Sequence, residues 1–228
     1  MKNIVLISAS PKINEQSVSK EFLDMASSRI DEGIFNKTFI DVRKSMTNHQ
    51  LPEAFEVLST ADVIIISFPL YVFCLPGILI RFLQDYYNYY TDNGNVRNKT
   101  KVYAIVNCGF PEPEINLEAV RVIQSFSRHI NGEFRFGVLI GGGPMMIAAK
   151  DAPFMKKPVQ KLSNALSSIA EDIKQEYVAK MDHIYIGANF PFSRRLYYFF
   201  GSRGWVTLAR KNKLRKADLF KKPYRLNE

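Results

Sequence analysis

The sequence predicts an α/β protein in which a doubly wound, five-stranded parallel sheet carries helices on both faces. Three observations predict this class. Five short apolar runs alternate with five amphipathic segments, the runs at residues 63–67 and 102–107 have the composition of strands covered on both faces, and 228 residues with 46% hydrophobic content fit one domain with its own core. The alternation favours right-handed crossovers between parallel strands.

The first half of the pattern begins with an apolar strand at residues 3–8. A helix follows from Ser17, with apolar residues at helical spacing up to Ile30. A short strand is expected at residues 38–40 and a helix at residues 53–60. The β-branched run at residues 63–67 predicts the next strand.

The second half of the pattern shows the same alternation of helices and strands. Residues 76–87 predict a helix that Pro76 opens, because proline is tolerated in the first helical turn. We then expect a strand at 102–107, a helix at 117–130, a strand at 134–140 and a long helix at 158–176. The predicted α/β domain spans residues 1–180, and residues 181–228 form a C-terminal extension.

Several classes of protein are disfavoured by composition. Residues 63–80 carry no charge, but Pro69, Pro76 and Gly77 favour strand, loop and helix over a membrane span. The N-terminal apolar run is interrupted by Lys12, Asn14, Glu15 and Gln16 before a signal peptide could form. Cys74 and Cys108 have no CxxC spacing, so neither a disulfide framework nor a zinc site is expected, and we predict a cytoplasmic protein.

The net charge of +9 is concentrated in the C-terminal extension. Residues 193–228 hold 11 Lys and Arg against 2 Asp and Glu, whereas the rest of the chain holds 20 of each. Such a basic surface attracts anionic partners, although a run of charge is more often only a solvated face.

Ligands of doubly wound sheets bind beyond the carboxyl ends of the strands, where the strand order reverses. The first loop there, residues 9–16, leads into a helix start. Free backbone N–H groups and the hydroxyls of Ser10, Ser17 and Ser19 suit this turn to a phosphate. The alternative is that Ser17 is only a helix cap.

The next two loops have a different character. Residues 68–76 are apolar and aromatic where a solvent-facing turn would be short and polar, so a flat apolar group or a neighbouring subunit is expected against Tyr71 and Phe73. Residues 107–112 include Gly109, which permits close backbone approach to a heteroaromatic edge, or which forms a generic turn. Together, the three loops outline flavin mononucleotide (FMN).

In these motifs the chain resembles the flavodoxin-like NAD(P)H-dependent FMN oxidoreductases, the group of FMN reductases, quinone reductases and iron-sulfur flavoproteins. The resemblance covers roughly residues 1–180. Ala9-Ser10-Pro11-Lys12 with the polar cluster after it matches the first-loop motif, although Ala9 replaces glycine and Lys12 replaces arginine. Pro69, Tyr71 and Pro76 match the Pro-x-Tyr loop.

The resemblance implies a set of FMN-binding residues and no catalytic side chain, because the flavin N5 carries the chemistry. The phosphate would be held in the first loop, the isoalloxazine by the second, and its pyrimidine side by the third. The implied residues are Ser10, Lys12, Asn14, Gln16, Ser17, Val18, Pro69, Leu70, Tyr71, Val72, Phe73, Asn107, Cys108, Gly109 and Glu112. Residues 43–52 hold no cysteine cluster, so no iron-sulfur centre is expected.

The implied function is an NAD(P)H oxidoreductase. Hydride would pass from NADH or NADPH to FMN and then to an acceptor such as a quinone, free flavin or nitroaromatic. The alternative is a flavodoxin-type electron carrier, although such carriers are shorter and acidic. Residues 141–146 are expected to form a mobile loop that either covers the flavin or only connects elements, and no metal site is expected because the three histidines are isolated.

The remaining expectations concern partners. The aromatic loop, the tyrosines at 86–90 and the aromatic extension predict a homodimer, as is common in the resembled family. No nucleic-acid partner is expected. The mixture of cations and aromatics in residues 194–214 leaves a membrane-surface or partner-binding flavoprotein as a further alternative, although packing on its own domain or a partner subunit is favoured.

Overall fold

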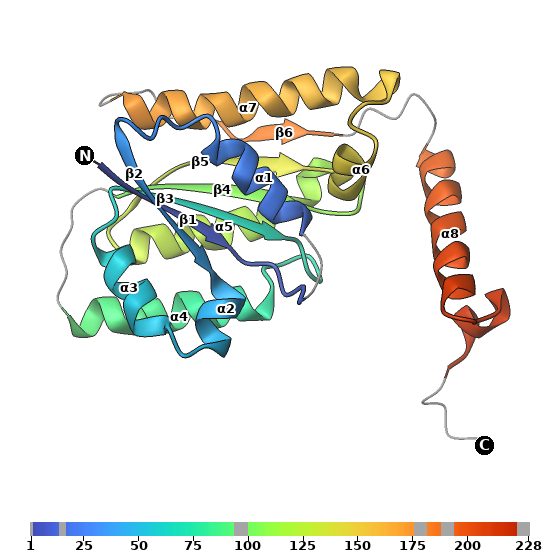
Figure 1. Ribbon diagram of the computed structural model, residues 1–228, viewed down its shortest axis with the longest axis horizontal. Helices are drawn as coiled ribbons and strands as arrows, with labels where there is room; N and C mark the ends of the chain where they lie inside the picture. The colour runs from blue at the N-terminus through green and yellow to red at the C-terminus, as the bar shows by residue number, and fades with distance from the viewer. Residues whose placement is uncertain (1, 14–16, 94–99, 176–181, 188–193, 223–228) are drawn as a thin grey trace. The chain divides into compact units, whose positions relative to one another are not determined.

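A single parallel sheet organises the computed structural model, which describes residues 2–13, 17–93, 100–175, 182–187 and 194–222 (Figure 1). The described residues contain six strands in the order β2-β1-β3-β4-β5-β6, and each neighbouring pair is parallel. They are β1 (Lys2–Ser8), β2 (Phe35–Asp41), β3 (Val63–Pro69), β4 (Lys101–Asn107), β5 (Glu133–Ile140) and β6 (Ile184–Ile186).

The predicted α/β class with a parallel sheet is confirmed, but the predicted number of five strands is wrong. The additional strand, β6, lies at residues 184–186 and pairs with Val138–Ile140 of β5. It has three residues, of which Ile186 is fully buried and Tyr185 is exposed. A segment this short has no measurable periodicity, so its sequence gives little sign of a strand.

Helices cover both faces of the sheet (Figure 1). On one face lie α1 (Val18–Ser27), α6 (Gly143–Ala148) and α7 (Lys156–Lys174). On the other lie α3 (Leu51–Ser59), α4 (Gly77–Asp92) and α5 (Leu117–His129), with the short α2 (Val42–Thr47) against α4. Single 3₁₀ turns, η1 (Pro113–Asn116) and η2 (Pro153–Met155), precede α5 and α7.

Alternate residues of the central strands build two apolar layers. Ile4 and Leu6 of β1 pack with α1 and α7, whereas Val5 and Ile7 pack with the helices of the opposite face. All four side chains are at most 1% exposed, and burying a side chain of this size stabilises the fold by about 1.5–3 kcal/mol. The sheet is thus a rigid platform for the loops at its edge.

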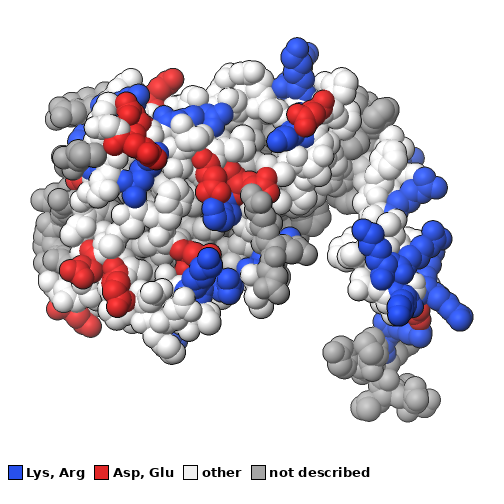
Figure 2. All heavy atoms as spheres, viewed as in Figure 1, with Lys and Arg blue, Asp and Glu red and all other residues white. Residues whose placement is uncertain are grey.

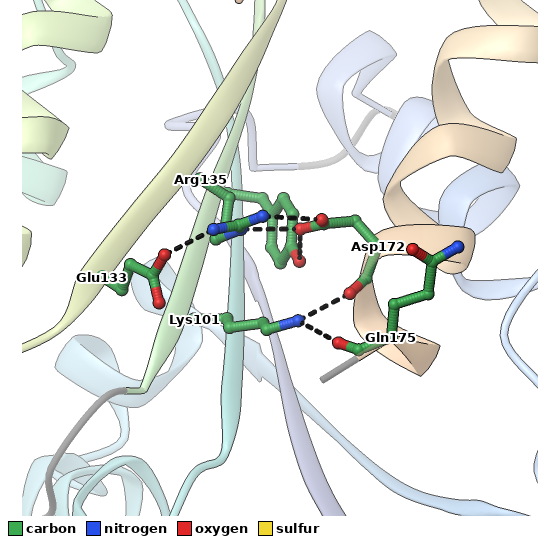
Figure 3. A network of polar contacts seen from close by, with 6 residues as sticks. Lys101, Glu133, Arg135, Asp172 and Gln175 are labelled. Carbon is green, nitrogen blue, oxygen red and sulfur yellow. Dashed lines mark hydrogen bonds and ion pairs between the residues drawn. The ribbon is translucent and has the colours of Figure 1, made fainter. Parts of the chain in front are cut away.

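A buried polar network fastens α7 to the amino ends of β4 and β5 (Figure 3). Arg135 donates from Nε and Nη2 to the two carboxylate oxygens of Asp172, at 2.9 Å each, and the Tyr103 hydroxyl donates to Asp172 at 2.5 Å. Lys101 Nζ donates to the carbonyl oxygens of Asp172 and Gln175, at 2.6 and 2.7 Å, at the end of the helix.

The buried charges of this network are paired with each other. Burial opposes ionisation of Asp172, but the Arg135 guanidinium and the Tyr103 hydroxyl outweigh it and hold the pKa of that carboxyl below its usual range. Arg135 and Asp172 are 7% and 2% exposed. The network lies at the strand ends opposite to those where ligands of such sheets bind, so we assign it to stability.

The segment at residues 141–146, which we expected to be a mobile loop, largely forms helix α6. Gly142 takes a left-handed conformation with φ 65°, Gly143 and Pro144 begin the helix, and its first hydrogen bonds run from Met145 and Met146 to the Gly142 carbonyl. Two of the glycines have a structural reason, since Gly142 is left-handed and Gly141 packs closely on Pro111 of the neighbouring loop.

The chain divides into two compact units, Met1–Asn189 and Phe190–Glu228. In the second unit, helix α8 (Arg194–Lys211) is followed by a 3₁₀ turn, η3 (Lys216–Phe220). The predicted extension from residue 181 therefore includes β6, which belongs to the sheet. Across the part of the chain that the structure describes, no helix combines the length and apolar character needed to cross a bilayer.

Candidate functional site

The loops after β1, β3, β4 and β5 are joined at one edge of the sheet. The Ala9 N–H donates to the Ser67 carbonyl at 3.0 Å, Leu70 N–H to the Asn107 carbonyl at 2.8 Å, and Cys108 N–H to the Ile140 carbonyl at 3.0 Å. The strand order reverses between β1 and β3, which is where ligands of open α/β sheets bind. The topology therefore places the predicted loops side by side.

The first loop ends in a polar helix start. Ser17 is the N-cap of α1, and its Oγ accepts a hydrogen bond from Lys20 N–H at 3.1 Å. The Ser17 and Ser19 hydroxyl oxygens are 3.3 Å apart, and these residues are 7% and 1% exposed. A capping hydroxyl that accepts from the backbone keeps its own proton, so it remains a donor.

Backbone geometry adds further donors at this helix start. The first i→i−4 bond of α1 runs from Glu21 N–H to the Ser17 carbonyl, so the N–H groups of Val18 and Ser19 precede the helical ladder. Ser67 Oγ donates to the Ser19 carbonyl at 2.7 Å and fixes the start of α1 to the end of β3. Ser67 was missing from the predicted site, because its supporting contact joins residues 48 positions apart.

The rest of the predicted phosphate loop is partly described. Ser10 is half-buried, and its Oγ accepts from Lys12 N–H at 3.4 Å. Lys12 is exposed, and Val18 is half-buried at the first position of α1. Asn14 and Gln16, which were also predicted to contact the phosphate, lie outside the described residues.

The second loop makes a tight turn with unusual backbone angles. Tyr71 and Cys74 exchange two backbone hydrogen bonds of 2.9 Å, and the residues between them, Val72 and Phe73, have φ values of 48° and 60°. Two-residue turns with positive φ at both central positions normally have asparagine and glycine there. A β-branched residue with positive φ is strained. Such strain concentrates at binding and catalytic sites.

The same turn exposes apolar surface. Tyr71 is 45% exposed, Val72 is 92% exposed and Phe73 is 61% exposed, whereas Pro69 and Leu70 at the end of β3 are half-buried. The Phe73 ring stacks on Phe110 of the third loop, with centroids 6.1 Å apart and planes inclined by 16°. Phe110 lies within the predicted segment 107–112 but was not among the predicted residues.

The third loop starts with a buried amide. Asn107 is 4% exposed, and no described group hydrogen-bonds its buried Oδ1 atom. A buried carbonyl oxygen without a partner is costly in a folded protein and calls for an explanation such as a ligand or water. Gly109 is exposed, and a Cβ added there would meet nothing within 4 Å, so the protein itself leaves space beside this backbone.

Two other predicted residues of the third loop have different environments. The Cys108 thiol is buried and lies 3.4 Å from the Phe110 carbonyl, and burial raises the pKa of that thiol. Because its N–H also bonds to Ile140, Cys108 supports the loop from within. Glu112 is half-buried at the start of η1.

The fourth loop buttresses the third. A Cβ on Gly141 would lie 2.3 Å from the Pro111 carbonyl oxygen, so only glycine fits there without displacement. Gly142 N–H donates to the Phe110 carbonyl at 2.6 Å, and Gly143 N–H to the Cys108 carbonyl at 2.9 Å. Buried Asn116 donates to the Ile140 carbonyl at 3.2 Å. These supporting residues were missed because their roles depend on contacts between loops.

The assembled edge has three chemically distinct parts. Hydroxyl and backbone donors stand at the α1 end, an exposed aromatic turn follows, and an unpartnered amide oxygen lies beside accessible backbone at β4. These parts suit an elongated ligand with an anionic end and a flat heteroaromatic end. No group of three or more His, Cys, Asp or Glu side chains within the described ranges is placed to hold a metal ion.

Comparisons with known proteins support the architecture. No family model matches the sequence, and no curated protein matches it. Among solved structures, an apo NADH:FMN oxidoreductase has a TM-score of 0.56 at 16% identity, with 79% of this chain and 94% of that chain covered. General stress protein 14 from Treponema denticola, in complex with FMN, has a TM-score of 0.53 at 17% identity, with 76% and 100% covered.

An azoreductase from Bacillus anthracis is also similar, with a TM-score of 0.51 at 14% identity over 74% of this chain and 100% of that chain. The chain therefore shares one α/β fold with these proteins. At such identities the likeness establishes the fold, and the chemistry of this chain has to be argued from its own loops.

Proposed function

We propose that this protein is an FMN-dependent NAD(P)H oxidoreductase. In this proposal residues 1–180 hold FMN, which accepts hydride from NADH or NADPH and passes electrons to a small acceptor such as a quinone, free flavin or nitroaromatic. The observation that carries the proposal is the hydrogen-bonded row of loops at the reversal of strand order, polar at α1 and aromatic after β3. Three neighbours named for NADH:FMN oxidoreductase activity, an FMN complex and azoreductase activity add support.

The phosphate end of FMN fits the start of α1. The Ser17–Ser19 hydroxyl pair keeps one proton beyond its own hydrogen bond, the N–H groups of Val18 and Ser19 are further donors, and a helix N-terminus favours negative charge. Ser10 and the exposed Lys12 lie on the same loop, so Lys12 supplies a cation as a point charge rather than the bidentate contact of an arginine. Asn14 and Gln16 remain predicted phosphate contacts.

The ring end fits the second and third loops. Residues 69–73 provide an apolar wall that excludes water, with Tyr71 and Phe73 as its aromatic members. Asn107 has a buried carbonyl oxygen without a hydrogen-bond donor, and the N–H of an isoalloxazine pyrimidine ring would supply one. Gly109 allows close backbone approach, and Cys108 and Glu112 complete the loop that we expect at this edge.

The protein needs no catalytic acid or base in this proposal. FMN, when bound, supplies hydride acceptance at N5 and electron delivery to the acceptor. The second and third loops, braced by the Phe73–Phe110 contact and by the glycines after β5, would hold the ring. Backbone donors in the third loop favour negative charge at the adjoining edge of the ring.

Anaerobic stopped-flow mixing of the FMN-loaded protein with NADH and with NADPH tests the function. The proposal predicts bleaching of the flavin absorbance with at least one of them. Bound flavin that neither nucleotide bleaches would instead favour a flavodoxin-type electron carrier.

Ser19→Ala tests the polar start of α1, because the Ser19 hydroxyl is buried and lies 3.3 Å from the Ser17 hydroxyl. We expect weaker FMN binding, whereas Ser127→Ala, which also removes a buried serine hydroxyl from a helix, should leave FMN binding unchanged. Equal FMN affinity for both variants would contradict the assignment of the α1 start to the phosphate.

We further propose a homodimer. Exposed Ile80, Tyr87 and Val122 line an apolar groove of about 500 Å³ between α4 and α5. Light scattering coupled to gel filtration should give twice the 26.2 kDa chain mass, and a single-chain mass at micromolar concentration would contradict this proposal.

A further inference from the structure

The second unit concentrates positive charge and exposed apolar side chains on one short segment. Residues 194–222 hold ten Lys and Arg but one acid, Asp218. Figure 2 shows Lys and Arg gathered over α8 and the segment after it. The proposed oxidoreductase site uses none of these residues.

One side of α8 forms a cationic hollow with η3. The hollow has a volume of about 670 Å³, and three cations line it: Arg203, Arg210 and Lys216. The Arg203 guanidinium lies 5.2 Å from the centre of the Phe199 ring, and Ser202 lines the same hollow. Cations beside a hydroxyl and an aromatic face suit an anionic group such as a phosphate.

Three aromatic or aliphatic residues on the other side of α8 are exposed. Tyr198, Trp205 and Leu208 are 40%, 65% and 50% exposed. Their separations of seven and three residues place them on one side of the helix, and 3.6 residues per turn place Arg203 and Arg210 on the opposite side. The helix therefore carries cations on one side, where η3 adds Lys216, and exposed aromatic and aliphatic side chains on the other.

We propose that α8 and η3 dock on the surface of a membrane that contains anionic phospholipids. In this arrangement Arg203, Arg210 and Lys216 pair with lipid phosphates, while Tyr198, Trp205 and Leu208 lie at the boundary between head groups and acyl chains. Tyr and Trp are favoured at that boundary, and basic residues are attracted to anionic leaflets. The helix lies on the membrane, because the described chain has no spanning helix.

Two other anionic partners fit the surface less well. A nucleic acid matches the cations and offers stacking to aromatic rings, but it leaves the exposed aliphatic residues Leu208, Leu214 and Leu219 in water. A folded acidic protein covers only one side of a helix, so it does not account for both sides of α8. Lipid head groups and acyl chains together contact both sides of a helix that lies at the interface.

Trp205 is the single tryptophan of the chain, so its fluorescence reports on this surface alone. The test adds the full-length protein to phosphatidylcholine vesicles with and without phosphatidylglycerol, and records Trp205 emission and vesicle flotation. The proposal predicts a blue shift and flotation with the anionic vesicles and neither with phosphatidylcholine alone. Binding should weaken as salt rises.

Two triple variants of equal charge test whether the cationic hollow binds the vesicles. Arg203→Gln/Arg210→Gln/Lys216→Gln should lower vesicle partitioning by about 100-fold, because each basic residue near an anionic surface contributes about 1 kcal/mol. The control variant, Lys150→Gln/Lys157→Gln/Lys161→Gln, removes the same charge from exposed positions of the first unit. It should lower vesicle partitioning less than about tenfold. Circular dichroism verifies that both variants keep their helix content.

Three outcomes would overturn the proposal. They are unchanged Trp205 emission and no flotation with anionic vesicles, equal partitioning of the two triple variants, and a response to a single-stranded oligonucleotide without a response to vesicles. None of these outcomes depends on bound flavin, so the membrane proposal and the proposed oxidoreductase function fail separately.

Discussion

The strained turn after β3 gives a sharp prediction about stability. Val72 has φ 48° and is 92% exposed, so its side chain contributes almost no burial while its backbone is strained. A non-glycine residue in this region costs about 1–3 kcal/mol, and asparagine tolerates it best after glycine. Val72→Asn should therefore stabilise the protein by about 1 kcal/mol, which raises Tm by about 2–4 °C for a chain of this size.

Thermal unfolding followed by circular dichroism measures this effect. The control is Val122→Asn in α5, where Val122 is 40% exposed and the backbone is helical. The free energy of unfolding of the control variant should fall by about 0.5 kcal/mol, because the substitution removes partly buried apolar surface without relieving strain. An unchanged or lower Tm for Val72→Asn would refute the argument that the turn is strained.

Three further predictions concern the supports around the site and the sheet. Asp172→Asn removes the buried carboxylate that pairs with Arg135 and leaves the exposed Glu133 as the acid beside that guanidinium, so it should cost up to about 3–5 kcal/mol in denaturant unfolding. Since the folded pKa of Asp172 is lowered, its stabilising effect is present above the unfolded pKa and is lost as pH falls through the folded value, so the variant should show a smaller loss of stability in acid than the parent. Gly141→Ala should lower Tm because its methyl group meets backbone, whereas Gly109→Ala should keep Tm and weaken FMN binding; the opposite order of Tm would contradict both assignments. Burial and the raised thiol pKa should make Cys108 resistant to iodoacetamide at pH 8 until the protein unfolds, which mass spectrometry of the labelled peptide checks, and rapid labelling of the native protein would count against its buried position.

Much of the fold could be predicted because the central strands are buried on both faces. Residues 63–66 and 102–106 carry aliphatic or aromatic side chains, and these pack alternately into the two layers. The edge elements could not be predicted in this way. Strand β6 has three residues, and helix α6 has six, starting in a segment whose three successive glycines suggest a loop.

The loops of the candidate site could be located from the sequence, since hydroxyl-rich and aromatic segments are visible there. Ser17 was expected at a helix start and caps α1. The left-handed turn at Val72 and Phe73 could not be foreseen, because neither residue favours positive φ. The fit of Gly141 against Pro111 was equally hidden, since it depends on two loops that only the folded sheet brings together.

Titration of the flavin-free protein with FMN and with riboflavin, followed by flavin fluorescence, tests the central claim most directly. If the loops after β1, β3 and β4 hold the cofactor with its phosphate at the start of α1, FMN should bind with one site per chain and much more tightly than riboflavin, which lacks the phosphate. Failure of the natively folded protein to bind FMN, or equal affinity for the two flavins, would contradict the account.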